Sequence, residues 1–89
     1  MNKELIFSGQ LLFLFKEDDF YVAKWLRGRS CYREDRVKKE ELLEVLTQEF
    51  NKKRETFENF KKNSIALQKQ NRDFDDSELY EIKKLLNLK

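Results

Sequence analysis

The residues best suited to chemistry lie in one block, residues 24–39, with the sequence KWLRGRSCYREDRVKK. It contains seven basic and two acidic residues, with the only Trp and the only Cys of the chain. Arginine pairs with phosphate or carboxylate through a two-pronged guanidinium, and aromatic faces stack on bases or guanidinium groups. The block, which we call the basic–aromatic block, therefore predicts a surface that binds an anionic partner. Nine residues are expected to form it: Lys24, Trp25, Arg27, Arg29, Tyr32, Arg33, Arg36, Lys38 and Lys39.

A plainer interpretation of the basic–aromatic block stays open. Trp25 can belong to the core, and its neighbours can pair with Glu34, Asp35 and a nearby acidic loop, which would leave a solvated basic turn. The charge distribution favours a specific surface, because the excess is local. Residues 1–23 hold two basic and four acidic groups, and residues 40–89 hold ten and eleven.

Catalytic chemistry finds little support in the residue types. The chain has no His, which excludes Ser-His-Asp triads, Cys–His dyads and imidazole general bases. Cys31 stands alone between Arg29 and Arg33, and we interpret it as a small residue without a catalytic role. Gly9 and Gly28 are too far apart in sequence for a glycine-rich phosphate loop. We predict that the protein is not an enzyme.

The acidic cluster Asp73, Asp75, Asp76 and Glu78 has the oxygen ligands that Ca²⁺ prefers. An EF-hand loop that starts at Asp73 requires Gly at position 78 and Glu at position 84, where this chain has Glu78 and Lys84. Zinc has no Cys and His ligand set in this sequence. We interpret the cluster as the start of a helix, with Asp75 and Glu78 as a capping box, and predict neither a metal nor a cofactor.

The first third of the chain predicts an antiparallel sheet that would position the block. Lys3–Phe7 is a short strand candidate that ends at a Ser-Gly turn. Residues 10–15 and 20–26 are rich in aromatic and other apolar residues around the polar loop Lys16–Asp19, which is typical of a hairpin. Residues 29–33 could add a further short strand.

Both faces of this hairpin are apolar. With a four-residue loop, Phe15 opposes Phe20 on one face and Leu14 opposes Tyr21 on the other, because side chains alternate along a strand. One face should lie against helices. The other needs cover from the same helices, from a second copy of the chain, or from a partner.

An alternative treats Phe20–Arg27 as a short helix. Asp18 or Asp19 would then cap its start, and Gly28 would follow its last turn. We favour the hairpin because the segment has a high β propensity.

From Asp35 the apolar residues recur at helical spacing. Neither Pro nor Gly interrupts residues 34–63, so this stretch can form one helix of about 27 residues and ~40 Å, longer than a strand of ~20 Å, and a broken helix stays open. Residues 51–56 contain no apolar side chain. The helix must project into solvent there, bend, or cover the core with the aliphatic stems of Lys53 or Arg54. A last helix is expected from about Ser77 to Leu88.

These patterns predict a single α+β domain over residues 1–89. A small N-terminal antiparallel sheet, a hairpin or meander of two to four strands at about 3–33, precedes a long or broken helix and a C-terminal helix within about 35–88. The predicted function is a non-enzymatic protein-binding module or inhibitor. It would dock on a larger protein or nucleoprotein, which can itself handle nucleic acid, through the basic–aromatic block. The alternative is that the same block binds DNA or RNA directly. The near-neutral charge of the rest of the chain argues against this alternative.

Location and assembly are also expectations at this point. The longest apolar run, Leu11–Phe15, is far shorter than the ~20 residues that span a bilayer. The start, MNKELIF, lacks the apolar length of a signal peptide, and one Cys cannot form an internal disulfide. We expect a cytoplasmic protein that makes no membrane contact, and homodimer formation stays open.

Overall fold

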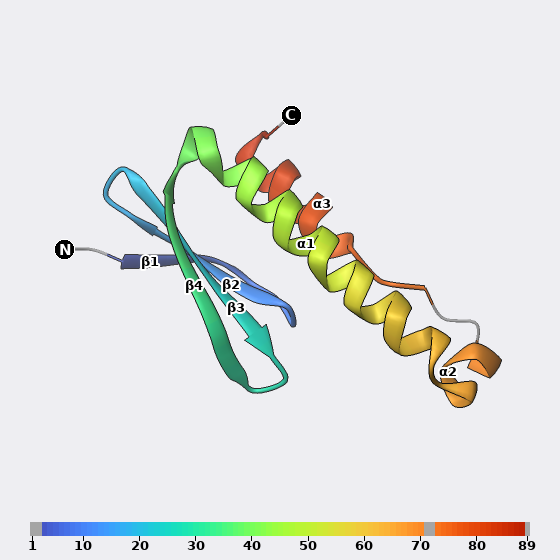
Figure 1. The fold of residues 1–89 in the computed structure, drawn as a ribbon. Coiled ribbons are helices and arrows are strands. Elements are labelled where there is room, and N and C mark those ends of the chain that lie inside the picture. Colours follow the sequence, from blue (N-terminus) through green and yellow to red (C-terminus); the bar gives the residue numbers. More distant parts are fainter. Residues whose placement is uncertain (1–2, 71–72, 89) are drawn as a thin grey trace.

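The computed structural model describes residues 3–70 and 73–88. A four-stranded antiparallel sheet in the order β1-β2-β3-β4 is followed by helices, so the predicted α+β class is confirmed (Figure 1). The strands are β1 Lys3–Ser8, β2 Leu12–Glu17, β3 Phe20–Arg27 and β4 Ser30–Lys38, and the helices are α1 Lys39–Lys62, α2 Ile65–Gln70 and α3 Ser77–Leu86.

The turn between β2 and β3 is tighter than predicted. It contains only Asp18 and Asp19, and Asp18 has a left-handed backbone with φ of 54°, which Asp adopts more readily than most residues. Leu14 therefore opposes Ala23, two residues from its predicted partner. A shift of two residues leaves each side chain on its predicted face, because the pleat has a period of two. The helical alternative for β3 is wrong.

The basic–aromatic block forms the end of β3, a two-residue turn and all of β4. We predicted that strand structure would end near residue 33 and that a helix would start near residue 35, and both boundaries are wrong. The strand continues because β4 pairs with β3 over its length, so that Arg36 opposes Val22 and Lys38 opposes Phe20. Pairing with a neighbouring strand here overrides a local helical pattern. Gly28, with φ of 63°, makes the turn that joins the two strands.

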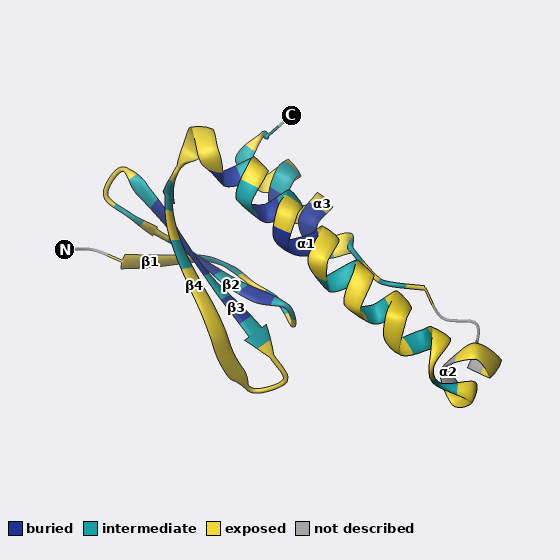
Figure 2. Cartoon of the chain, viewed as in Figure 1, coloured by how far each residue is buried: buried dark blue, intermediate teal, exposed yellow. Residues whose placement is uncertain are grey.

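One face of the sheet, which we call the inner face, packs against α1 and α3. Trp25 lies at its centre, edge-on to Phe50 of α1, with ring centroids 5.6 Å apart. Figure 2 shows the buried residues on β2, β3, α3 and the first half of α1. The core consists of Leu12, Leu14, Tyr21, Ala23, Trp25, Leu42, Leu46, Phe50, Leu79 and Ile82.

None of the helices in residues 3–70 and 73–88 lies on the opposite face, which we call the outer face (Figure 1). We considered three ways to cover the second face of the sheet, and the first of these, cover by the same helices, is not what the structure has. Alternation places Leu5, Phe13, Phe15, Phe20 and Val22 on this face. Leu5 is 51% exposed, whereas Val22 is only 3% exposed because its strand neighbours surround it.

α1 runs unbroken from Lys39 to Lys62, and its second half extends past the sheet toward α2 (Figure 1). Lys53 reaches back to donate a hydrogen bond to the carbonyl oxygen of Leu26, 3.2 Å away, and Arg54 binds Asp76. Of the three arrangements considered for the polar stretch, the helix adopts projection, and the long side chains there also connect it to the rest of the fold. None of the helices in the described part of the chain is long and apolar enough to cross a membrane.

A carboxylate at the start of α3 also hydrogen-bonds the connection between β1 and β2. Both carboxylate oxygens of Glu78 accept from the backbone N–H of Leu11, at 3.1 and 3.2 Å. Gly9 leaves room for this carboxylate, because a Cβ there would lie 1.7 Å from Oε1 of Glu78. The predicted capping box is therefore wrong: Glu78 bonds Leu11, the N-cap residue of α3 is Asp76, and the Asp75 carboxylate accepts from the N–H of Ser77 at 3.0 Å instead of from that of Glu78. Loss of the hydrogen bond between Glu78 and Leu11 would therefore loosen the attachment of α3 to the β1–β2 connection.

We expect Glu78→Ala to lower the free energy of unfolding by about 1–3 kcal/mol, because the partly buried N–H of Leu11 loses its acceptor. The matched control is Glu81→Ala on an exposed position of α3, which should change stability by less than about 0.5 kcal/mol. Urea unfolding followed by circular dichroism measures both. Equal losses in the two variants would show that the Leu11 hydrogen bond has no special weight.

Candidate functional site

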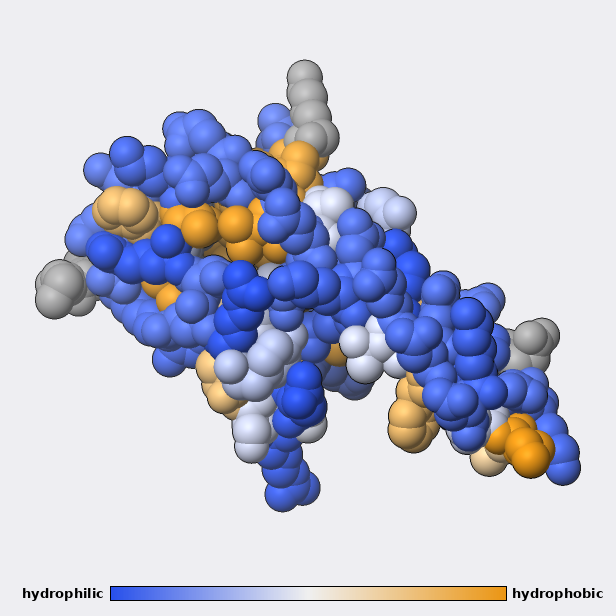
Figure 3. Space-filling view, in the orientation of Figure 1, coloured by the Kyte–Doolittle hydropathy of each residue, from blue (hydrophilic) through white to orange (hydrophobic). Residues whose placement is uncertain are grey.

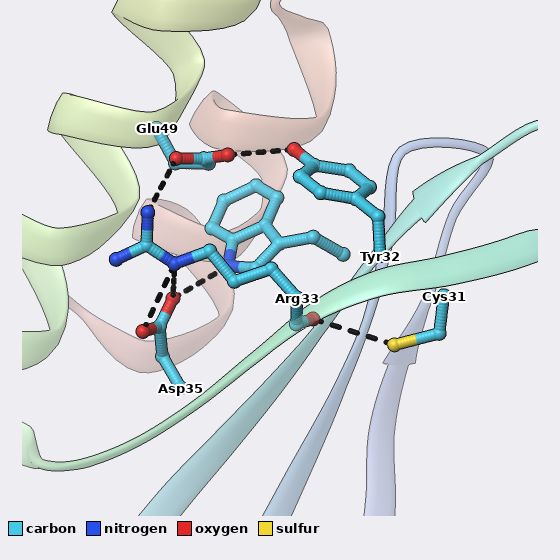
Figure 4. A network of polar contacts seen from close by, with 6 residues as sticks. Cys31, Tyr32, Arg33, Asp35 and Glu49 are labelled. Atoms are coloured by element: carbon cyan, nitrogen blue, oxygen red, sulfur yellow. Dashed lines mark hydrogen bonds and ion pairs between the residues drawn. The ribbon is translucent and has the colours of Figure 1, made fainter.

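A buried carboxylate connects β4 to α1 (Figure 4). Glu49 is only 5% exposed, although it is ionisable. One of its oxygens accepts from the hydroxyl of Tyr32 at 2.6 Å, and the other accepts from the guanidinium of Arg33 at 3.1 Å. A buried charge is tolerated when it is paired and hydrogen-bonded, and Glu49 meets both conditions.

The same network continues into the core. Arg33 also contacts Asp35, with Nε 3.0 Å from one carboxylate oxygen, and this contact raises the pKa of the Arg33 guanidinium. Asp35 in turn accepts from the indole N–H of Trp25 at 3.0 Å. The chain Trp25–Asp35–Arg33–Glu49–Tyr32 therefore joins β3, β4 and α1 in one set of polar contacts, drawn in Figure 4.

Two cations lie close to the ring of Tyr32. The guanidinium carbon of Arg27 is 4.9 Å from the ring centroid and the ammonium of Lys53 is 4.8 Å from it. Burial raises the pKa of the Tyr32 phenol well above its ordinary value, and the hydrogen bond and negative charge of Glu49 raise it further. Tyr32 therefore stays a protonated donor throughout the physiological range.

The pKa of Lys53 is shifted in the opposite direction. Burial lowers the pKa of its ammonium, Glu49 partly offsets the effect, and Arg27 adds to it. The ammonium group therefore lies in a poorly hydrated position. A cation in such a position gains more from a counter-ion than one in bulk water does.

These residues line a groove of about 490 Å³ between the second half of α1 and one end of the sheet. Its polar side carries Arg27, Tyr32, Lys52 and Lys53. Its apolar side is formed mainly by phenylalanine rings. The full lining is Leu11, Arg27, Tyr32, Glu49, Lys52, Lys53, Thr56, Phe57, Phe60 and Phe74. We call this space the α1 groove.

The outer face holds a different group of cations. The ammonium of Lys24 lies 5.4 Å from the ring centroid of Phe15 and 3.7 Å from Glu34. Arg36 lies over Phe20, with its guanidinium carbon 4.2 Å from the centroid. These two cations lie over aromatic rings of the outer face, at contact distances typical of cation–π pairs.

The nine predicted residues are thus divided among several places. Trp25 is fully buried, which corrects its expected place on the surface and assigns it to the core. Arg33 is engaged by two carboxylates, so it acts as a structural link. The plainer interpretation is right for these two residues. Lys24, Arg36 and Lys38 belong to the outer face, Arg27 and Tyr32 to the α1 groove, Arg29 to the β3–β4 turn, and Lys39 to the start of α1.

The acidic residues near α3 have structural partners. Asp73 pairs with Lys61 at 3.7 Å, and Asp76 pairs with Arg54. Hydrogen bonding to the Ser77 backbone lowers the pKa of Asp75. The sequence placed these carboxylates at a helix start correctly, but their contacts with the second half of α1 were not foreseen. They hold the segment that carries Phe74 against that helix.

Sequence reasoning missed the α1 groove and the importance of Glu49. Glu49 lies three residues after Leu46 and next to Phe50, in the buried stripe of α1, and this placement was the available signal. The phenylalanine Phe74 comes to Phe57 from a segment 17 positions away, with ring centroids 6.1 Å apart. Such a contact cannot be read from local spacing.

Comparisons with protein-family models, with curated proteins and with solved structures found no match for this chain. The geometry of the molecule defines a class: a small α+β domain with an uncovered sheet face and a separate basic–aromatic groove.

The Tyr32–Glu49 bond predicts a specific pH dependence. We expect Tyr32→Phe to lower the free energy of unfolding by about 1 kcal/mol at pH 7, because the ring is 38% exposed and solvent weakens the bond. The folded pKa is raised, so this stabilisation is complete below the ordinary value of 10.0 and is lost as pH rises above it. The difference in the free energy of unfolding between wild type and Tyr32→Phe should therefore shrink between pH 10 and pH 11.

Urea unfolding at pH 7, 9, 10 and 11 provides the measurement. Tyr80→Phe, at an exposed ring on α3, controls for the loss of a hydroxyl as such. A wild-type advantage over Tyr32→Phe that stays constant up to pH 11 would contradict the protonated Tyr32–Glu49 bond.

Proposed function

We propose that the protein is a non-enzymatic binding module that docks on an acidic surface of a larger protein through the outer face of its sheet. The observation that carries this proposal is the uncovered apolar surface of a four-stranded sheet, with Leu5 51% exposed. Apolar atoms gather at the sheet end of the molecule and again near α2, amid otherwise hydrophilic surface (Figure 3). An exposed apolar face with a polar margin is typical of a protein–protein interface.

The free energies of apolar burial and of exposed ion pairs indicate which residues would supply the affinity of such a surface. Full burial of a Leu or Phe side chain contributes roughly 1.5–3 kcal/mol, whereas an exposed ion pair contributes about 0–1 kcal/mol. The apolar residues would therefore supply most of the affinity. Lys3, Lys24 and Arg36 would set the orientation and favour an acidic partner, because charges at an interface margin act mainly on specificity and association rate.

Direct nucleic-acid binding remains the second candidate, favoured by one observation. Phe13, Phe15 and Phe20 share an open sheet face with basic side chains, and bases stack on aromatic rings in such an arrangement. Against it, Lys24 and Arg36 already have carboxylate neighbours in Glu34 and Glu17. Each phosphate contact would have to compete with an existing ion pair.

Affinity capture from a lysate of the host, with and without nuclease, tests the proposal. The double variant Lys24→Glu/Arg36→Glu should retain at least about tenfold less of a protein captured by wild type, because like charges at an interface repel. Lys62→Glu, on an exposed position of α1, should capture as wild type does. Circular dichroism and thermal melts confirm that each variant is folded.

A second pair of variants tests the apolar part of the surface. Leu5→Ser on the outer face should reduce capture, whereas Ile65→Ser, at an even more exposed apolar position on α2, should not. Equal capture by all variants would overturn the outer face as the interface. Capture that disappears after nuclease treatment, together with DNA or RNA binding whose salt dependence is steep, would instead establish the nucleic-acid candidate.

A further inference from the structure

The α1 groove is a second candidate site, and it shares no residue with the outer face. Its volume of about 490 Å³ falls within the range of small-molecule sites, roughly 300–1,000 Å³. It lies where α1 leaves the sheet, so one wall comes from α1 and the other from Leu11, Arg27 and Tyr32. The groove therefore has the size and the two-sided shape that a small ligand requires.

The apolar part of the groove consists of aromatic rings. Phe57 and Phe74 contact each other with their planes at 59°, and both line the groove. Phe60, one turn further along α1, is 65% exposed and continues the same wall. Flat apolar groups pack well against such rings, in offset or edge-to-face arrangements.

The polar part has an excess of positive charge. Arg27, Lys52 and Lys53 line the groove, and Glu49 is the single carboxylate among the lining residues. Both oxygens of Glu49 are already occupied, one by Tyr32 and the other by Arg33. The carboxylate is thus engaged at the base of the groove and leaves the three cations available to a ligand.

Lys53 is the cation best placed to hold an anion. Its ammonium donates one hydrogen bond, to the carbonyl oxygen of Leu26, and an ammonium has three N–H donors. The group is half-buried, and that burial has removed part of its hydration. An anionic group placed beside it would replace the lost water with a charge-assisted hydrogen bond.

We propose that the α1 groove binds a small organic anion with a flat apolar body. The apolar body lies against Phe57, Phe60 and Phe74, and the anionic group contacts Lys53, with Arg27 and Lys52 as further cations. This site is independent of the proposed protein-docking function, because the residues that line it are different.

Two fluorescent probes of similar shape test the proposal. 8-Anilinonaphthalene-1-sulfonate carries an anionic group, and N-phenyl-1-naphthylamine has the same ring system without a charge. We expect the sulfonate to bind wild type at least about tenfold more tightly than the neutral probe. Lys53→Met keeps the length of the side chain but removes its charge. It should weaken sulfonate binding about tenfold and change binding of the neutral probe by less than about twofold.

Two control variants report on location. Lys52→Gln should weaken sulfonate binding only about two- to threefold, because Lys52 is exposed and contributes through a screened charge. Lys24→Met on the outer face should leave it unchanged. Equal binding of both probes by wild type, or a loss in Lys24→Met as large as that in Lys53→Met, would overturn the proposal.

A backbone amide NMR titration of wild type with the sulfonate does not depend on any variant folding. The largest shift changes should fall at Arg27, Tyr32 and residues 52–57. Changes centred on Phe13, Phe15 and Phe20 would place the probe on the outer face and overturn the assignment to the α1 groove. Failure here would leave the capture experiment on the outer face untouched, so the two proposals are tested separately.

Discussion

The fold depends on a buried carboxylate that must remain paired. Glu49 lies in the buried stripe of α1, where an unpaired charge would cost several kcal/mol. Tyr32 and Arg33 satisfy its two oxygens from β4, so β4 and α1 are held at one position relative to each other. Tyr32 and Arg33 both belong to the basic–aromatic block. The need to pair the buried Glu49 therefore determines which members of the block remain free to bind a partner.

The strand pleat divides the rest of the block. Alternation along β3 and β4 directs Lys24 and Arg36 to the outer face, and it directs Trp25 and Arg33 toward the helices. A run of positive charge that looks continuous in sequence is therefore distributed over two surfaces and one internal network. The two surfaces differ in chemistry, since one is an apolar sheet face with cations over its rings and the other is a groove lined by phenylalanine rings and cations.

The parts of the fold governed by short-range periodicity could be predicted. The two-residue period assigned Leu14 and Phe15 to opposite faces correctly, and that assignment survived an error in turn length because the error was an even number of residues. The helical spacing located α1 and its polar stretch. The first residue of α1 was missed because residues 35–38 fit a helix by themselves, and only pairing with β3 makes them a strand.

The site was less predictable, for a related reason. Its groove brings together Tyr32 from β4, Lys53 from α1 and Phe74 from the segment before α3, and their proximity depends on packing between distant elements. The sequence located the charge but could not show that Arg33 would be consumed by Asp35 and Glu49. Propensity and spacing describe neighbours in the chain, and these contacts join residues that are far apart in it.

The central claim is that helices cover one face of the sheet and leave the other face open. A soluble gadolinium relaxation agent tests it most directly, by measuring relaxation of side-chain protons at a concentration where sedimentation gives the mass of 10.9 kDa. The account predicts strong relaxation of the methyl groups of Leu5 and clear relaxation of the Phe15 ring. Leu14 and Phe50, both 0% exposed, should be protected. Equal protection of Leu5 and Leu14 in the monomer would contradict it, because a second layer would then cover the outer face.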